Sequence, residues 1–488
     1  MFFLISSNRV LTYTLSTTLC YIISQAAMEL LQRSAAKIQR KATTINSLQD
    51  NTSGEDGKED HASDEMLKKS KEVATSLRGR LDRLTPLSTT CCIYRVPQKL
   101  RKVNMEAYTP RVVSIGPLHH GEEHLVAMEE HKLRYLQNFL SESGKTLEEC
   151  VEIISREEKR ARDCYMERIN MSSKEFVEMI LLDGCFIIEV ILGPRDPDLR
   201  GPNDRVYNKP WLITDVCRDM TLLENQLPFP LLQILYNLAL PGHENDCSFL
   251  TFSIEFFRDL LKMPKIKSPE FARNISSTYK VEHFLDLLRV CQLPLSLMTS
   301  RGQSKRIYTM IPTATELHEA GVRFELGSEN KDLIDIDYTR DGVLKIPKLI
   351  LDHKRESLFR NFIAFEQCHC QKTYIADYIV LMDQLINTTR DVDILVKTKI
   401  IDNWLGDNVA VTNMFNNLLI NAIGGSDSYL ADISEGLNEY YHVPWNKRKA
   451  ALTRDYFSSP WRGASTIAAV ILLLLTLIQT IFSGMSVK

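Results

Sequence analysis

The side chains best suited to chemistry gather in one short stretch of the sequence. His120 and His124 are four residues apart, the spacing that presents two imidazoles to one metal ion on a helix. The HExxH motif is absent, and a polar loop that enters a helix commonly caps that helix. We assign no metal-binding residue and keep a metal-dependent enzyme using residues 119–131 as the alternative hypothesis. Further donors in this stretch are His119, Glu122, Glu123, Glu130 and His131.

The Cys368-His369-Cys370 run offers a second set of potential metal ligands. Adjacent side chains point apart on a helix, and cysteine in an aromatic helix is usually a small hydrophobe. The chain also lacks GxxxxGK[ST], GxGxxG and GxSxG, so a phosphate-binding loop and a nucleophile elbow have no support. We assign no catalytic or cofactor-binding residue and expect no cofactor, although a site assembled from distant positions would leave no such motif.

Three polar residues, Glu224, Asn225 and Gln226, stand between apolar runs just before Pro228. They could form an acidic active-site wall. A helix end between packed helices, however, leaves backbone groups that need hydrogen-bond partners. We therefore expect these side chains to bond to backbone groups and to have a structural role.

The segment that contains the first histidines, residues 93–121, is predicted to be irregular and mostly extended. Pro97, Pro110 and Pro117 fix φ and disfavour helix at the residues before them. Over residues 122–141, apolar side chains recur at helical spacing, which predicts a half-buried helix.

Helices should also form most of the remaining folded chain. Ser172 and Glu175 have the spacing of a capping box, and the apolar run after them should be the central core helix. Acidic residues inside that run argue against a membrane span. Thr313 and Glu316 repeat the capping spacing before a short helix that Gly321 can end. Further helices are expected at residues 66–83, 211–224, 229–240, 281–292, 356–368, 374–387, 391–405 and 409–423.

The pattern changes between residues 322 and 346. VRFEL, LIDIDY and GVLKI alternate or contain β-branched residues, and Asp341-Gly342 is a turn signal. These runs predict a small antiparallel sheet. The predicted fold class is therefore mainly α, with a multi-helix globular body, a small antiparallel β insertion and one C-terminal transmembrane helix.

The transmembrane prediction concerns residues 463–485, a stretch of 23 residues without a charge. A helix that rises about 1.5 Å per residue needs about 20 residues to cross the hydrocarbon core. Its 11 Leu, Ile, Val and Phe residues favour insertion, and Gln479 is the only strongly polar side chain. Insertion should gain on the order of 5 kcal/mol. We predict a C-terminal anchor in a lipid bilayer.

The flanks of this stretch predict its orientation. Lys488 is the only charged residue after it, and the positive-inside rule then places the body in the cytosol. Trp445, Tyr456 and Trp461 suit the headgroup region, where an amphipathic ring keeps one edge in water. An ordinary basic helix is the alternative. The basic residues that precede the stretch are Lys447, Arg448, Lys449, Arg454 and Arg462.

Composition limits the partners. Lys plus Arg (59) and Asp plus Glu (62) nearly cancel, with net charge −3, so we expect no nucleic-acid partner. The 11 scattered cysteines, without a CxxC pair, favour reduced thiols and a cytosol-facing body. N-glycosylation triplets would matter only in a lumenal body, and they leave the side of the membrane open. They lie at Asn51, Asn170, Asn274 and Asn387.

Residues 1–90 are predicted to precede the folded domain. Residues 2–24 suggest a signal or anchor, but Arg9 interrupts them, and a dispensable leader before Met28 or Met66 is the alternative. Residues 51–63 lack core-forming side chains and should stay unfolded. The expected organisation is a leader and charged segment at 1–90, a helical domain at 91–445, a basic juxtamembrane segment at 446–462 and a transmembrane helix at 463–485.

Seven ordered blocks resemble a plant family, the domain of unknown function 247, also called uncharacterised protein family 0481. The resemblance covers about residues 93–482. It implies a single-span, mostly helical membrane protein without an established enzymatic activity, and some grass members are implicated in self-incompatibility. The blocks are YRVPQKLRKVNMEAYTPRVVSIGPLHHG, EFVEMILLDGCFIIEV, LLENQLPFPLL, IPTATELHEAGVRF, LFRNFIAFEQC, DYIVLMDQLINTTRDVDIL and WNKRKAALTRDYFSSPW.

We interpret the chain as a membrane-anchored interaction or recognition module with a protein partner, whose identity and oligomeric state the sequence leaves unassigned. A helical adaptor that the anchor merely targets to an internal membrane is a further hypothesis.

Overall fold

The computed structural model describes residues 59–82, 88–193, 204–240, 246–261, 269–299, 307–329, 331–423, 427–456 and 460–486. The chain forms two compact units, Met1–Leu87 and Ser88–Lys488. The described part of the first unit is mainly helix α2 (Glu59–Leu81), whose described side chains are nearly all exposed. It begins inside the segment that we predicted to stay unfolded, because acidic residues favour the first turn of a helix. The signal or leader prediction lies outside the described residues.

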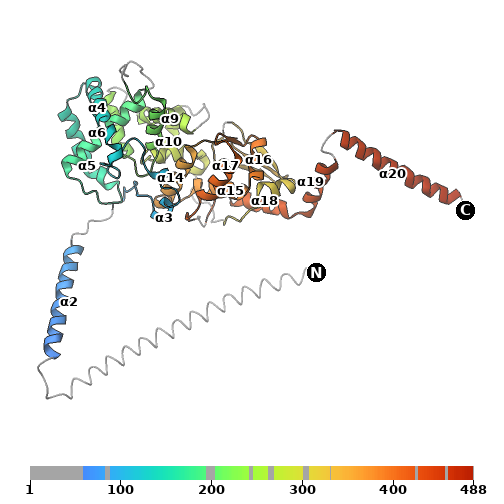
Figure 1. The fold of residues 1–488 in the computed structure, drawn as a ribbon, viewed down its shortest axis with the longest axis horizontal. Helices are drawn as coiled ribbons and strands as arrows, with labels where there is room; N and C mark the ends of the chain where they lie inside the picture. The colour runs from blue at the N-terminus through green and yellow to red at the C-terminus, as the bar shows by residue number, and fades with distance from the viewer. Residues whose placement is uncertain are drawn as a thin grey trace. The chain divides into compact units, whose positions relative to one another are not determined.

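In the second unit, α6 (Ser173–Leu192) is the centre of a first group of helices. Ser172 and Glu175 form the predicted capping box, and the side chains of α6 are buried on nearly all sides. Figure 1 shows the neighbouring helices gathered around α6. It packs against α4 (Glu129–Ser143), α5 (Leu147–Asp163), α8 (Phe229–Ala239) and α9 (Asp246–Leu261).

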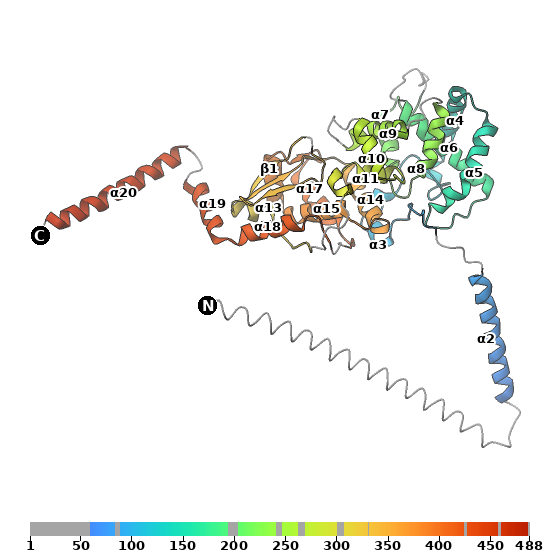
Figure 2. The ribbon, with the colours of Figure 1, turned by 180° about the vertical axis from the view of Figure 1, so that it is seen from behind.

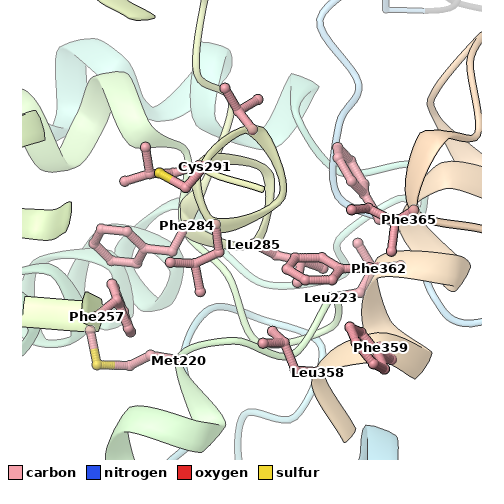
Figure 3. Packing of buried hydrophobic residues seen from close by; sticks show 14 of the residues in the cluster. Met220, Leu223, Phe257, Phe284, Leu285, Cys291, Leu358, Phe359, Phe362 and Phe365 are labelled. Carbon is pink, nitrogen blue, oxygen red and sulfur yellow. The ribbon is translucent and has the colours of Figure 1, made fainter. Parts of the chain in front are cut away.

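A second group of helices surrounds α14 (Arg355–Cys368). The two groups share one core, because Phe284 and Leu285 of α11 lie between Phe257 of α9 and Phe362 of α14 (Figure 3). Phe257 and Phe284 are in ring contact, with centroids 5.3 Å apart. The neighbours of α14 are η1 (Glu106–Tyr108), α11 (Phe284–Val290), α15 (Tyr374–Leu385) and α17 (Asn408–Leu418).

The small sheet is mixed. β2 (Asp337–Thr339) and β3 (Val343–Ile346) form the predicted antiparallel hairpin, and Gly342 at its turn has φ +82°. β1 (Arg323–Leu326), however, pairs with β3 in parallel, because the chain between β1 and β2 carries the backbone to the far edge of β3. A second, parallel pair joins β4 (Leu349–Leu351) to β5 (Ile401–Asn403). Figure 2 shows the sheet of β1 beside α13 and α18.

Some helices begin or end at other residues than predicted. The helix predicted over 391–405 is α16, which ends at Lys397, and the chain continues as a strand. Lys399 adopts φ 63°, which terminates α16. The helix predicted over 281–292 starts at Phe284, because the backbone carbonyl of Glu282 accepts a hydrogen bond from the backbone N of Phe229 instead of joining the helix.

The remaining helices complete the mainly α fold, which confirms the predicted class. These helices are α3 (Gln98–Arg101), η2 (Glu123–Met128), α7 (Pro210–Asp219), α10 (Pro269–Thr278), α12 (Leu295–Thr299), α13 (Ala314–Glu319), α16 (Thr389–Lys397), α18 (Ala431–His442), α19 (Pro444–Tyr456) and α20 (Pro460–Ser486). Gly321 ends α13 with φ +98°, as predicted.

The C-terminal helix α20, shown in red in Figure 1, is apolar and long. Within it, Trp461–Phe482 are 22 residues with the length and composition needed to cross a membrane. In the most apolar part of this segment, no residue is buried against the rest of the protein. Among the described residues it is the one helix that meets these criteria.

Candidate functional site

Glu224 lies where the extended segment 93–121 meets the helical core. Its Oε1 accepts a hydrogen bond from the backbone N of Val96 at 2.6 Å and lies 2.5 Å from Nη2 of Arg101. Its Oε2 lies 3.3 Å from Nε2 of His119. Burial alone would raise the pKa of Glu224, but the contact with His119 and the charge of Arg101 outweigh it and lower that pKa. Glu224 is therefore a charged anchor for the extended segment.

The next two residues bond to backbone groups in the same way. Asn225 accepts from the N of Ile115 at 2.7 Å and donates to the carbonyl of Val113 at 3.0 Å. Gln226 donates to the carbonyls of Met220 and Leu222, each at 2.8 Å. The structural role predicted for Glu224, Asn225 and Gln226 is confirmed, because their side chains satisfy backbone groups that no regular element pairs.

Two further carboxylates accept hydrogen bonds from the backbone of the extended segment 93–121. Asp219 accepts from the backbone N atoms of Arg111 and Val112, each at 2.8 Å. Asp183 accepts from the N of Gly116 at 2.8 Å and lies 2.5 Å from Nζ of Lys132. Lys132 is fully buried, yet its carboxylate partners outweigh burial and raise its pKa. We call Lys132, Asp183, Asp219, Glu224, Asn225 and Gln226 the loop-anchoring network.

The histidine-rich stretch does not form the arrangement that the alternative, metal-dependent hypothesis requires. Gly121, with φ +81°, places a turn after His120, and η2 begins only at Glu123, so His120 and His124 do not share a helical face. His124 Nε2 instead donates to the carbonyl of Pro110 at 3.1 Å. Across the described part of the chain, no group of three or more His, Cys, Asp or Glu side chains is arranged to hold a metal ion.

The other donors of that stretch are dispersed among separate contacts. His119 is buried, and its Nδ1 lies 2.6 Å from Oε1 of Glu122. Glu130 pairs with Arg134 on the exposed side of α4. Burial lowers the pKa of His131. These side chains pair with neighbours or pack against the body, and do not converge on one centre.

The Cys368-His369-Cys370 run ends α14 and also has structural contacts. His369 stacks on Phe365 with centroids 5.1 Å apart, and its Nδ1 lies 3.0 Å from the hydroxyl of Tyr94. Burial raises the pKa of Cys368 to about 11 and that of Cys370 to about 12. Both side chains are therefore neutral thiols near pH 7, as expected for small hydrophobes.

A polar cleft of about 480 Å³ opens between the start of α14 and α17. Its size is within the range of small-molecule pockets. Arg360 forms part of its wall, but Nε of Arg360 lies 2.8 Å from Oε1 of Glu356, which also accepts from Nδ2 of Asn104 at 3.0 Å. Glu356 and Arg360 therefore pair with each other in the wall of the cleft, which Asp352 and His353 also line. No sequence pattern indicated this cleft, because its walls come from distant segments.

A larger hollow of about 1070 Å³ lies between the β2–β3 hairpin and α18. Asp432, Glu435 and Glu439 follow one another on α18 at helical spacing, and their side chains are exposed. Tyr338 and Tyr440 supply aromatic surface. We call this hollow the α18 groove. Its carboxylates outnumber its cations, Arg340 and Lys449, and so it suits a positively charged chain segment.

The chain is similar to uncharacterised plant proteins over most of its length. Residues 93–475 match the family model for the domain of unknown function 247, described as a plant protein of unknown function. A UPF0481 protein of Arabidopsis thaliana is 33% identical over 416 residues, covering 80% of this chain and 86% of the relative. A putative UPF0481 protein of Arabidopsis thaliana is 22% identical over 496 residues, covering 83% and 93%. No solved structure gives a significant match to the chain.

Proposed function

The chain belongs to the plant family named for the domain of unknown function 247, and since that family assigns no activity, we propose that the protein is a membrane-anchored interaction or recognition module. The observation that carries the anchor is the uncovered apolar surface of α20. Leu473 is 70% exposed and Phe482 65% exposed. Apolar side chains at this density are unfavourable in water, and a lipid bilayer covers them on all sides.

The residues before α20 support an interfacial position. Trp445 and Trp461 are 69% and 86% exposed, and rings of this kind concentrate at the headgroup level. Nζ of Lys447, on α19, lies 3.6 Å from the ring centroid of Tyr441 on α18, so this cation is held against an aromatic ring. The basic residues of 446–462 favour a cytosol-facing body.

Alkaline carbonate extraction of membranes tests the anchor. The full-length protein should stay in the pellet, and Leu473→Arg with Leu474→Arg should move it to the supernatant. Each arginine at the centre of a span costs about 3 kcal/mol, and the pair together offsets the insertion energy of about 5 kcal/mol. The matched control is Leu67→Arg with Val73→Arg on α2, which is outside the proposed span and should leave the protein in the pellet. Wild-type protein in the supernatant would refute the anchor.

The α18 groove supports the interaction part of the proposal. Its occupant would be an extended Lys- and Arg-rich segment of a partner protein, because exposed carboxylates attract such a segment over about 8–10 Å at physiological salt. The aromatic rings of Tyr338 and Tyr440 add surface against which the stems of basic side chains can pack.

Fluorescence anisotropy with a labelled lysine–serine octapeptide tests this groove on the full-length protein. Glu435→Lys with Glu439→Lys should weaken binding by about tenfold or more, because two attractive charges become repulsive. The matched control is Glu148→Lys with Glu152→Lys on α5, which also reverses two exposed acidic residues one turn apart. Equal loss in both double variants would show that only net charge matters and would remove the groove as the binding site.

A further inference from the structure

Cys92 and Cys164 lie side by side although they are far apart in the sequence. The backbone N atoms of Cys92 and Ile93 both donate to the carbonyl of Cys164, each at 2.9 Å. Ile93 and Tyr165 form a parallel bridge, and the N of Met166 donates to the carbonyl of Ile93 at 3.0 Å. This register places the two cysteines opposite each other. Neighbouring strands are about 4.8 Å apart, within the Cα separation of about 4.4–6.8 Å that disulfides need.

The two thiols are close enough to influence each other's acidity. The S–H group of Cys164 donates to the carbonyl of Arg160 at 3.3 Å. The interaction with Cys92 lowers the pKa of Cys164 despite its partial burial, whereas the interaction with Cys164 and burial both raise the pKa of Cys92. Because the thiolate is the reactive species, the lowered pKa of Cys164 favours reaction at its sulfur.

Only one of the two sulfurs is open to a reagent. Cys92 is fully buried, whereas Cys164 is partly exposed and lines a hollow of about 140 Å³ with Arg160 and Lys280. Because a water molecule occupies about 30 Å³ of liquid, the hollow admits a peroxide molecule. Cys164 is also the C-cap residue of α5, so oxidation would act on the junction between α5 and the segment around Ile93.

We propose that Cys92 and Cys164 are a peroxide-oxidisable pair in which Cys164 reacts first and Cys92 closes the disulfide. The Cys164 thiolate attacks one oxygen of hydrogen peroxide, the O–O bond breaks, and Cys164 becomes a sulfenic acid as hydroxide leaves. The Cys92 sulfur then attacks the Cys164 sulfur and displaces the second hydroxide. The protons of the two thiols convert the two hydroxides to water, so two thiols and one peroxide give one disulfide and two water molecules.

The disulfide would fasten Cys92 to the end of α5 and close a chain loop of about 70 residues, which restricts the unfolded state. Oxidation should therefore raise the melting temperature by several degrees, and dithiothreitol should reverse the shift. This inference does not depend on the membrane anchor or the α18 groove, because its readout lies in the helical body.

Peptide mapping of the full-length protein in detergent tests the proposal. After reduction, brief peroxide treatment and alkylation, trypsin should release a disulfide-linked pair of peptides, residues 84–95 and 163–168. The pair should be two hydrogen atoms lighter than the two reduced peptides together, and fragmentation should assign the link to Cys92 and not Cys91. Two alkylated thiols, a Cys91 link, or Cys164 overoxidised beside a free Cys92 would each overturn the proposal.

Substitutions separate the two roles. Cys92→Ser should leave the sulfenic acid on Cys164, where dimedone traps it, whereas Cys164→Ser should leave Cys92 unmodified. Cys217→Ser is the control, because burial raises the pKa of the partly exposed Cys217 to about 12 and makes it unreactive. The control should form the same disulfide as the wild type. If a variant fails to fold, the mapping of the wild-type protein decides alone.

Discussion

Glu224 illustrates how far the role of a single residue can be read from the sequence. Apolar neighbours and Pro228 predict that a polar side chain there is buried and must bond to something. Its partners could not be predicted, because Val96 lies 128 residues earlier in the chain. The same holds for Asn225 and Ile115, which are 110 residues apart. Sequence reasoning thus predicts the need for a partner, and only the fold supplies it.

The alternative hypothesis for the histidine-rich stretch lacks support for a local reason. The spacing of His120 and His124 indicates one helical face only if the helix already includes His120. Gly121 takes a left-handed conformation and the next turn is a 3-10 helix, so the two residues do not share one helical face. Gly121, between the two candidate ligands, indicated that the helix need not include His120.

Glu189 gives a prediction about pH dependence. It is 6% exposed, its Oε1 has no hydrogen-bond partner, and burial together with the charge of Glu142 raises its pKa to about 8. In the unfolded chain its pKa is about 4.3, so unfolding releases a proton between these values and stability falls as pH rises through this window. Glu189→Gln should remove this loss and should be more stable than the wild type by about 5 kcal/mol at a pH of about 9.

Chemical denaturation at several pH values measures the effect. The difference between Glu189→Gln and the wild type should be small at a pH of about 4 and grow toward alkaline pH. Glu178→Gln is the matched control, because Glu178 lies on the same helix but is exposed, and its difference should not change with pH. A constant difference for Glu189→Gln would show that the carboxyl is ionised in the folded protein.

At the scale of elements, capping signals were the most reliable guide. Ser172-Glu175 and Thr313-Glu316 start helices as predicted. Thr146 and Glu149 form the same box before α5, a helix that we did not predict although its signal was present. The parallel pairing of β1 with β3 could not be read from the sequence, because a hairpin signal specifies only consecutive strands.

The end of α16 gives a prediction about helix termination. Ile400 N bonds to Leu395 O and Lys399 N bonds to Val396 O, each at 2.9 Å, which is a Schellman motif with Lys399 in the left-handed position. A side chain with Cβ is disfavoured there, whereas glycine is not. Lys399→Gly should therefore stabilise the protein by about 0.5–1 kcal/mol in chemical denaturation.

Lys397→Gly is the matched control for this substitution. Lys397 is an exposed residue of the same helix, two positions earlier and inside the last turn. Glycine there should destabilise the protein by about 1 kcal/mol, because it lowers helix propensity without relieving a left-handed conformation. The same sign for both variants would contradict the Schellman assignment.

For the whole molecule, the sequence was most informative where a property is local. A long uncharged stretch predicts an apolar helix without knowledge of any neighbour, and α20 has the expected length and exposure. The cleft beside Arg360 and the α18 groove are products of the fold, since each is lined by segments that the sequence separates. Candidate surfaces for partner recognition therefore required the structure.

The proposed orientation of the whole chain depends on the charged residues on either side of α20. Lys447, Arg448 and Lys449 precede α20 and Lys488 follows it, so the cytosol-facing arrangement proposed above leaves the C-terminal end in the lumen. An added C-terminal tag of about 20 residues with one N-glycosylation triplet should therefore be glycosylated in microsomes, with a mass shift that endoglycosidase H removes. The natural triplet at Asn170, whose side chain is exposed, should stay unmodified in the same preparation. Replacing Lys447, Arg448 and Lys449 by glutamine should reduce tag glycosylation, because the retained charge difference is smaller. Glycosylation at Asn170 with an unmodified tag would place the body in the lumen and reverse the proposed orientation.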